Sequence, residues 1–172
     1  MESFLDMTLD RNLYIGVPVG AFLCSLFLLF CFFNTIRSRT VRSLRAVLAS
    51  CLVWTGGVIL MRLQVFPGIW FWHNFALMGL LVIPVFMYAF LFSFLEITEH
   101  DALIYIYGVL TVALVLGNAW SSTLVPAPEA VTRADGTCVY VYHATVGIWV
   151  LVALEILVLV YATYLAHCKI GG

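Results

Sequence analysis

The stretch AFLCSLFLLFCFF at positions 21–33 decides the fold class. Its apolar side chains do not alternate with polar ones, which excludes a strand of a transmembrane β-barrel. Because backbone polar groups in lipid must be hydrogen-bonded within their own segment, the stretch is predicted to be helical. A span needs about 20 apolar residues, and this run extends over about Leu13–Asn34. The segment before it carries Glu2, Asp6 and Asp10 rather than basic residues, so it does not have the pattern of a signal peptide.

The composition of the whole chain is typical of a membrane protein. Of its 172 residues, 64% are hydrophobic and 10% are charged, and the mean hydropathy is +1.09. A soluble domain has roughly 25% charged residues. We therefore predict an all-α integral membrane bundle of about five transmembrane helices. The four further spans are predicted at about Val41–Leu63, Trp70–Phe94, Ala102–Trp120 and Val141–His167.

The arginines predict the orientation of the bundle. Short loops that are rich in lysine and arginine stay in the cytoplasm. The link between the first two spans contains Arg37, Arg39, Arg42 and Arg45. This places the N-terminus outside and the C-terminus in the cytoplasm. The predicted location is the inner, cytoplasmic membrane, which the chain crosses several times.

The loop between the last two spans, residues 121–140, is the one segment with soluble-protein character. Asp135-Gly136 is a hairpin signal with β-compatible residues on both sides. A short β-hairpin over the outer mouth of the bundle and a plain linker are both compatible with this pattern.

The sequence lacks the patterns of membrane-embedded catalysis. No lysine lies within a predicted span, which excludes a retinal Schiff base, and no Cys-x-x-Cys motif exists. An intramembrane protease would need a serine or carboxylate dyad, and no second deep carboxylate accompanies Glu155. His73 and His143 share the outer leaflet and could meet around a metal or haem, although histidines at helix ends are also ordinary interfacial side chains. We predict no catalytic residue, no metal and no cofactor.

Glu155 is the strongest single candidate for a functional residue, because it lies near the middle of the fifth span among apolar neighbours. A carboxylate there is costly, so it should face the bundle interior and be protonated. One interpretation is a ligand contact or a protonation switch. The other is a neutral acid that sets helix register by bonding a hydroxyl such as that of Thr55 or Thr111. The sequence leaves both open.

Aromatic and polar residues gather where the outer ends of four predicted helices meet. They are either an aromatic belt, which bilayer interfaces select, or a ligand vestibule in which polar groups add directional donors to an apolar wall. Pro84, deeper on the third helix, either kinks that helix to form a floor or packs statically. The predicted ligand-binding residues are Arg62, Trp70, His73, Asn74, Asn118, Tyr142 and Glu155.

The second and third spans resemble a known family. An arginine-rich inner link precedes a helix with Trp54 followed by Gly56-Gly57, and the third helix contains Gly79 and then Pro84. This Trp-x-x-Gly and Gly-x-x-x-x-Pro pattern resembles the N-terminal seven-transmembrane sensor region of bacterial histidine kinases, a type that also precedes diguanylate cyclases. The family has seven spans and the chain shows five. The chain is interpreted either as a small membrane bundle in itself or, as we favour, as a module excised from a longer protein. Whether two helices are missing at its C-terminal end is left open by the sequence.

The resemblance implies that residues 1–172 form a single transmembrane sensory domain of a two-component system. Such a domain would bind a small apolar or amphiphilic ligand in its outer half and signal to a cytoplasmic output domain, which would hold any kinase or cyclase activity. The expected partners are the lipid bilayer, the ligand and the output domain, with a homodimer left open and no nucleic acid. The alternative is a small membrane transporter or accessory subunit without an output domain, and an intramembrane enzyme comes third. A transporter would need a polar path, for which Glu155 alone is thin support.

Overall fold

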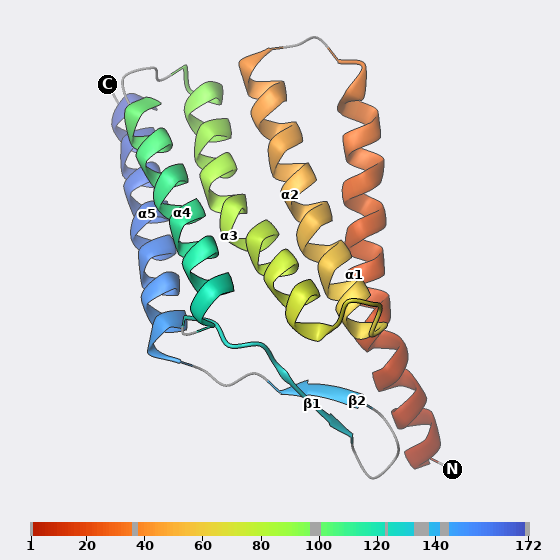
Figure 1. Ribbon diagram of the computed structural model, residues 1–172. Coiled ribbons are helices and arrows are strands. Elements are labelled where there is room, and N and C mark those ends of the chain that lie inside the picture. Colours follow the sequence, from red (N-terminus) through yellow and green to blue (C-terminus); the bar gives the residue numbers. More distant parts are fainter. Residues whose placement is uncertain are drawn as a thin grey trace.

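The computed structural model of the chain is a helical bundle with a two-stranded sheet across one end (Figure 1). It describes residues 2–35, 38–96, 101–122, 124–132, 138–141 and 145–170. The elements, in chain order, are α1 (Glu2–Phe33), α2 (Arg39–Arg62), α3 (Ile69–Phe94), α4 (Asp101–Ser121), β1 (Glu129–Thr132), β2 (Cys138–Val141) and α5 (Val146–Ile170).

Among the described residues, four helical stretches are long and apolar enough to cross a bilayer. They are Ile15–Phe33, Arg39–Arg62, Ile69–Phe94 and Ile104–Ser121. In α5 the apolar stretch that can be assessed is shorter and covers Glu155–Leu165. The predicted helical membrane fold is therefore confirmed for the first four spans, and the chain is a multi-pass membrane protein.

The predicted start of the fifth helix at Val141 is wrong. Val141 ends β2, and α5 begins only at Val146. Three of the four residues of β2, Val139, Tyr140 and Val141, are β-branched or aromatic and favour a strand. β2 pairs antiparallel with β1, with Glu129 opposite Val141. The helix thus starts after the strand has ended. The predicted turn at Asp135-Gly136 lies outside the described residues.

Helices α2 and α3 pack with their backbones in contact. A Cβ atom placed on Gly57 of α2 would lie 2.8 Å from Cβ of Ala76 on α3. One placed on Gly79 of α3 would lie 2.9 Å from the carbonyl oxygen of Ser50 and closer still to the backbone nitrogen of Trp54. Small residues allow this approach in membranes, where packing rather than water exclusion holds helices together.

Helix α1 packs on α2. Gly56 faces it, since a Cβ atom there would lie 3.4 Å from the ring of Phe22. At the end where α1 passes into α2, the guanidinium of Arg45 donates to the carbonyl groups that end α1. These belong to Phe32 and Phe33, and the guanidinium also donates to the carbonyl of Thr35, two residues beyond the helix.

Helix α3 is the centre of the bundle, because α2, α4 and α5 all contact it. Figure 1 shows α3 changing direction near its middle, the region that contains Pro84. A proline inside a helix removes one backbone hydrogen bond and commonly bends the helix. On one side of Pro84, Leu77 and Leu81 pack with Val115 of α4.

Candidate functional site

The densest polar contacts lie at the end of the bundle that carries β1 and β2, which we call the β end (Figure 1). Asn118, in the last turn of α4, is 1% exposed. Its Oδ1 accepts from the backbone N–H groups of Leu124 (3.1 Å) and Val125 (2.8 Å), and its Nδ2 donates to the carbonyl of Val125 (3.1 Å). One side chain therefore holds the backbone of two consecutive loop residues, the Leu124–Val125 segment.

The first two turns of α3 lie beside the same segment. Nδ2 of Asn74 donates to the carbonyl of Trp70 (2.9 Å), which turns its Oδ1 toward Nδ2 of Asn118 (3.4 Å). Nε2 of His73 lies 3.4 Å from the carbonyl oxygen of Val125, and His73 is buried. The indole of Trp70 donates to the hydroxyl of Ser122 (3.3 Å). Four of the predicted ligand-binding residues, Trp70, His73, Asn74 and Asn118, are thus brought together.

The floor of this site is apolar. The side chain of Val125 packs against the cluster of Leu77, Leu81 and Val115, together with Leu114. The space that the sequence suggested for a ligand is therefore occupied by a segment of the chain itself. Polar groups hold the backbone of that segment, and an apolar cluster holds its side chain.

The Leu124–Val125 segment is also fastened to α5. The hydroxyl of Thr145 donates to the carbonyl of Leu124. A Cβ atom placed on Gly147 would lie 2.8 Å from the Cα of Leu124, so the first turn of α5 touches the loop backbone. Three helices, α3, α4 and α5, consequently meet at one loop segment.

The sheet adds a contact to α2. The hydroxyl of Tyr140 on β2 donates to the carbonyl of Met61 (2.8 Å), and both side chains are buried. Arg62, another predicted site residue, follows Met61 in the last turn of α2 and is half-buried. Tyr142, also predicted, lies outside the described residues.

The most exposed aromatic side chains of the β end fit an aromatic belt. Phe66 is 90% exposed and Trp120 is 94% exposed, so both point away from the bundle. The aromatic-belt interpretation and the vestibule interpretation of this region therefore apply to different residues. Exposed aromatic side chains face the surroundings, and the amide side chain of Asn118 faces inward.

Glu155 does not belong to the cluster at the β end. Its Oε2 accepts a 2.7 Å hydrogen bond from the hydroxyl of Tyr107 on α4. Tyr107 lies eleven residues before Asn118 on that helix, roughly 16 Å along its axis. Of the two predicted partners, Thr55 instead donates to the carbonyl of Cys51 in its own helix. Sequence reasoning missed Tyr107, although its position four residues before Thr111 places both on one helix face.

Metal binding finds no support in the described part of the chain, where no group of three His, Cys, Asp or Glu side chains could hold an ion. His143, the suggested partner of His73, lies outside that part. His73 instead faces the carbonyl of Val125.

Comparison with known proteins shows which family this arrangement belongs to. The family model for the N-terminal 7TM region of histidine kinases matches residues 17–168 of the chain. The chain belongs to this family. No curated protein and no solved structure matches the chain. The resemblance inferred from the second and third spans is thereby confirmed.

The glycine, tryptophan and proline residues on which the family resemblance was based have structural roles in the helices. Gly57 and Gly79 are the points at which the backbones of α2 and α3 touch, and Trp54 supplies part of the backbone that Gly79 contacts. Pro84 lies inside α3, beyond Gly79 in the chain. The motif therefore describes a helix pair, and it does not by itself identify a ligand site.

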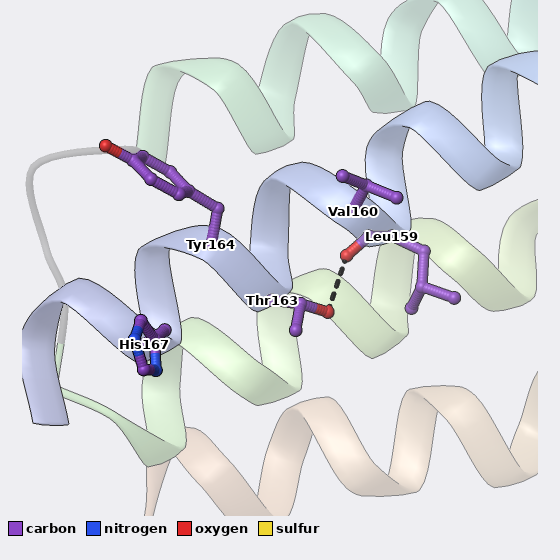
Figure 2. Close-up of a pocket in the computed structure, with 5 residues that line it drawn as sticks. All are labelled: Leu159, Val160, Thr163, Tyr164 and His167. Carbon is purple, nitrogen blue, oxygen red and sulfur yellow. Dashed lines mark hydrogen bonds between the residues drawn. The ribbon is translucent and has the colours of Figure 1, made fainter.

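Helix α5 carries a shallow open hollow on its surface (Figure 2). Its lining residues, Leu159, Val160, Thr163, Tyr164 and His167, all come from that one helix. The hydroxyl of Thr163 is bonded to the carbonyl of Leu159 (2.9 Å). Ligand sites enclose most of their ligand with convergent polar groups. This hollow has the character of an exposed helix face instead.

Proposed function

We propose that this chain is the sensory input domain of a histidine kinase in the cytoplasmic membrane. It binds a small apolar or amphiphilic ligand at the β end, which faces outward, and passes a helix shift to a cytoplasmic output domain. Catalysis belongs to that output domain and not to these residues. The observation that carries the proposal is the Leu124–Val125 segment, to which α3, α4 and α5 are all joined.

The physical argument concerns coupled contacts. A ligand shifts an equilibrium only as far as its affinity differs between two arrangements of the protein. Moving Leu124–Val125 changes the hydrogen bonds of Asn118, the contact of His73 and the bond of Thr145 together. A small ligand at this place would thus alter the relative stability of two packings of three helices.

The surroundings suit a ligand that is at least partly apolar. The floor consists of Leu77, Leu81 and Val115. Trp70 and Phe71 beside the site are 52% and 43% exposed, so an amphiphile in the outer leaflet would meet aromatic surface at its edge. The polar groups of Asn118 and His73 would orient it.

The test uses the full-length kinase that carries this region, in membrane vesicles supplied with radiolabelled ATP. Asn118→Ala releases the loop segment from α4, so the autophosphorylation rate without ligand should change by roughly fivefold or more, the usual size of coupling between sites. Leu116→Ala, at an exposed position of the same helix, is the matched control and should leave the rate unchanged.

A folded Asn118→Ala kinase with the wild-type rate would refute the sensory role of the β end. Solute uptake by proteoliposomes that contain only this chain would favour the competing transporter function.

A further inference from the structure

The hydrogen-bonding capacity of Asn118 is completely used. An asparagine side chain offers two acceptor positions on its oxygen and two N–H donors. The oxygen receives the N–H groups of Leu124 and Val125, and the nitrogen donates to the carbonyl of Val125 and to Oδ1 of Asn74. Because Asn118 is 1% exposed, water does not reach it while the Leu124–Val125 segment is in place.

The direction of this amide group is determined by its neighbour. Asn74 donates through Nδ2 to the carbonyl of Trp70, so its Oδ1 is left to face Asn118. Nδ2 of Asn118 must then point toward Asn74, and its Oδ1 must point toward the loop. The site therefore presents Oδ1 of Asn118 as an acceptor for N–H groups and, beside it, Nδ2 as a donor for a carbonyl. This pair is complementary to an amide group.

The apolar part of the occupant is matched as well. The branched side chain of Val125 packs against Leu77, Leu81 and Val115. The carbonyl of the same residue accepts from Nδ2 of Asn118 and lies near Nε2 of His73. The occupant is an amide that carries a short branched aliphatic group.

We propose that the Leu124–Val125 segment is an internal occupant of the sensor site, and that the external ligand displacing it is an amide-bearing amphiphile, such as an acylated amino-acid amide or a short apolar peptide. This rests on the proposed function and names its ligand class. A ligand without N–H donors that displaced the segment would leave Oδ1 of Asn118 buried and without a hydrogen bond. Sites that are built to bond a donor strongly reject ligands that lack one. A fatty-acid anion has only acceptors and is therefore excluded.

The experiment follows the exposure of the segment. The chain, with its five cysteines replaced by serine and Val125→Cys added, is placed in lipid nanodiscs and treated with N-ethylmaleimide. Labelling should be slow, because the segment is closed, and N-acetyl-leucyl-valinamide should accelerate it saturably by roughly tenfold. Octanoate, of similar apolar size, should have no effect.

Two further variants keep the test decisive. Val131→Cys, at an exposed position of β1, should label at one rate whatever is added. Thr145→Val removes the bond to Leu124 from the residue that directly precedes α5 and should accelerate labelling at position 125 without the probe. If Val125→Cys does not fold, Leu124→Cys replaces it as the reporter.

Equal acceleration by octanoate and by the amide, or none by the amide at its solubility limit, would overturn the proposal. The kinase assay separates it from the proposed function. A kinase that responds to octanoate but not to the amide retains the sensory function and refutes the amide ligand. Amide-dependent labelling with an unchanged kinase rate supports the amide site and refutes the sensory function.

Discussion

The hydroxyl of Tyr107 on α4 donates a 2.7 Å hydrogen bond to Oε2 of Glu155 on α5, and both side chains are half-buried. The ring of Tyr107 also stands edge-on to Tyr88 of α3, with ring centroids 6.0 Å apart, and Tyr88 stands edge-on to Phe92 at 5.6 Å. An ionisable residue in a membrane helix commonly faces its neighbours and pairs with them. This contact joins α5 to α4 away from the β end.

Substitutions at Glu155 should separate its hydrogen bond from its charge. Glu155→Gln retains an oxygen that accepts from Tyr107, so we expect a melting temperature in detergent close to that of the wild type. Glu155→Lys has no acceptor and puts a cation beside Tyr107, so the yield of folded protein should collapse. Size-exclusion chromatography and thermal unfolding measure both effects. A stable Glu155→Lys protein would mean that the side chain is free to leave the helix contact.

The partner variant Tyr107→Phe removes the same hydrogen bond from the other side. Interhelical hydrogen bonds in membrane proteins contribute about 0.6 kcal/mol on average, so the loss in the free energy of unfolding should be of that size. Tyr105→Phe, on the same helix and 75% exposed, is the control. In the Glu155→Gln background the effect of Tyr107→Phe should persist, because the glutamine still accepts.

Gly79→Ala should destabilise the bundle, because the added methyl group would meet the backbone of α2 at Ser50 and Trp54. Overpacking of this kind costs about 1–3 kcal/mol, and backbone atoms cannot turn aside as a side chain does. Gly117→Ala on α4, where nothing lies within 4 Å of the added atom, should be neutral or slightly stabilising. Equal melting temperatures for the two variants would show that α2 and α3 do not touch at Gly79.

The fold was more accessible to sequence reasoning than the site was. Length and hydropathy constrain a membrane helix strongly, since a span of about 20 apolar residues has few alternatives in lipid. The depth argument that grouped Trp70, His73, Asn74 and Asn118 succeeded for the same reason, because position along a span determines height in the bilayer. Depth also places Glu155 apart from them, near the middle of the fifth span. It could not identify Tyr107 as the partner of Glu155, since depth says nothing about which neighbouring helix a side chain faces.

The occupant of the site could not be predicted. Asn118 bonds the backbone of Leu124 and Val125, and a backbone group carries no sequence signal. The path of an irregular loop depends on such contacts. The start of α5 was misplaced for a related reason. The run Val139-Tyr140-Val141 is apolar enough to be read as the start of a span, and only its pairing with β1 makes it a strand.

Arg45 should stabilise the junction of α1 and α2. Its guanidinium bonds the carbonyl groups of Phe32 and Phe33 in the last turn of α1 and that of Thr35 just beyond the helix, where helix ends leave carbonyl groups in need of partners. Arg45→Ala should lower the free energy of unfolding by about 2 kcal/mol, the size expected for hydrogen bonds to a charged group. Arg42→Ala is the matched control, because Arg42 is exposed and its loss removes the same charge from the same link. Arg45→Lys should recover little, since an ammonium lacks the planar fork that reaches several oxygens.

The orientation of the bundle is the last prediction, and four arginines carry it. Arg37 lies between the first two spans, and Arg39, Arg42 and Arg45 lie in the first two turns of α2. A short basic segment of this kind stays in the cytoplasm. The β end, at the opposite end of α2, must then face outward. The best reporters leave every arginine in place and lie at exposed positions. They are Thr35→Cys in the link and Glu129→Cys on β1, each in a cysteine-free chain.

In intact cells a membrane-impermeant maleimide should label Glu129→Cys and not Thr35→Cys, and permeabilised cells should show both. A second variant replaces Arg37, Arg39 and Arg42 with glutamine and keeps Arg45, which bonds the end of α1. Arg62, at the opposite end of α2, then competes with the single remaining arginine of the link. The preference for a cytoplasmic link should weaken, and molecules of both orientations should be present. Labelling of Thr35→Cys alone in intact cells would invert the topology, and the ligand site at the β end would then face the cytoplasm.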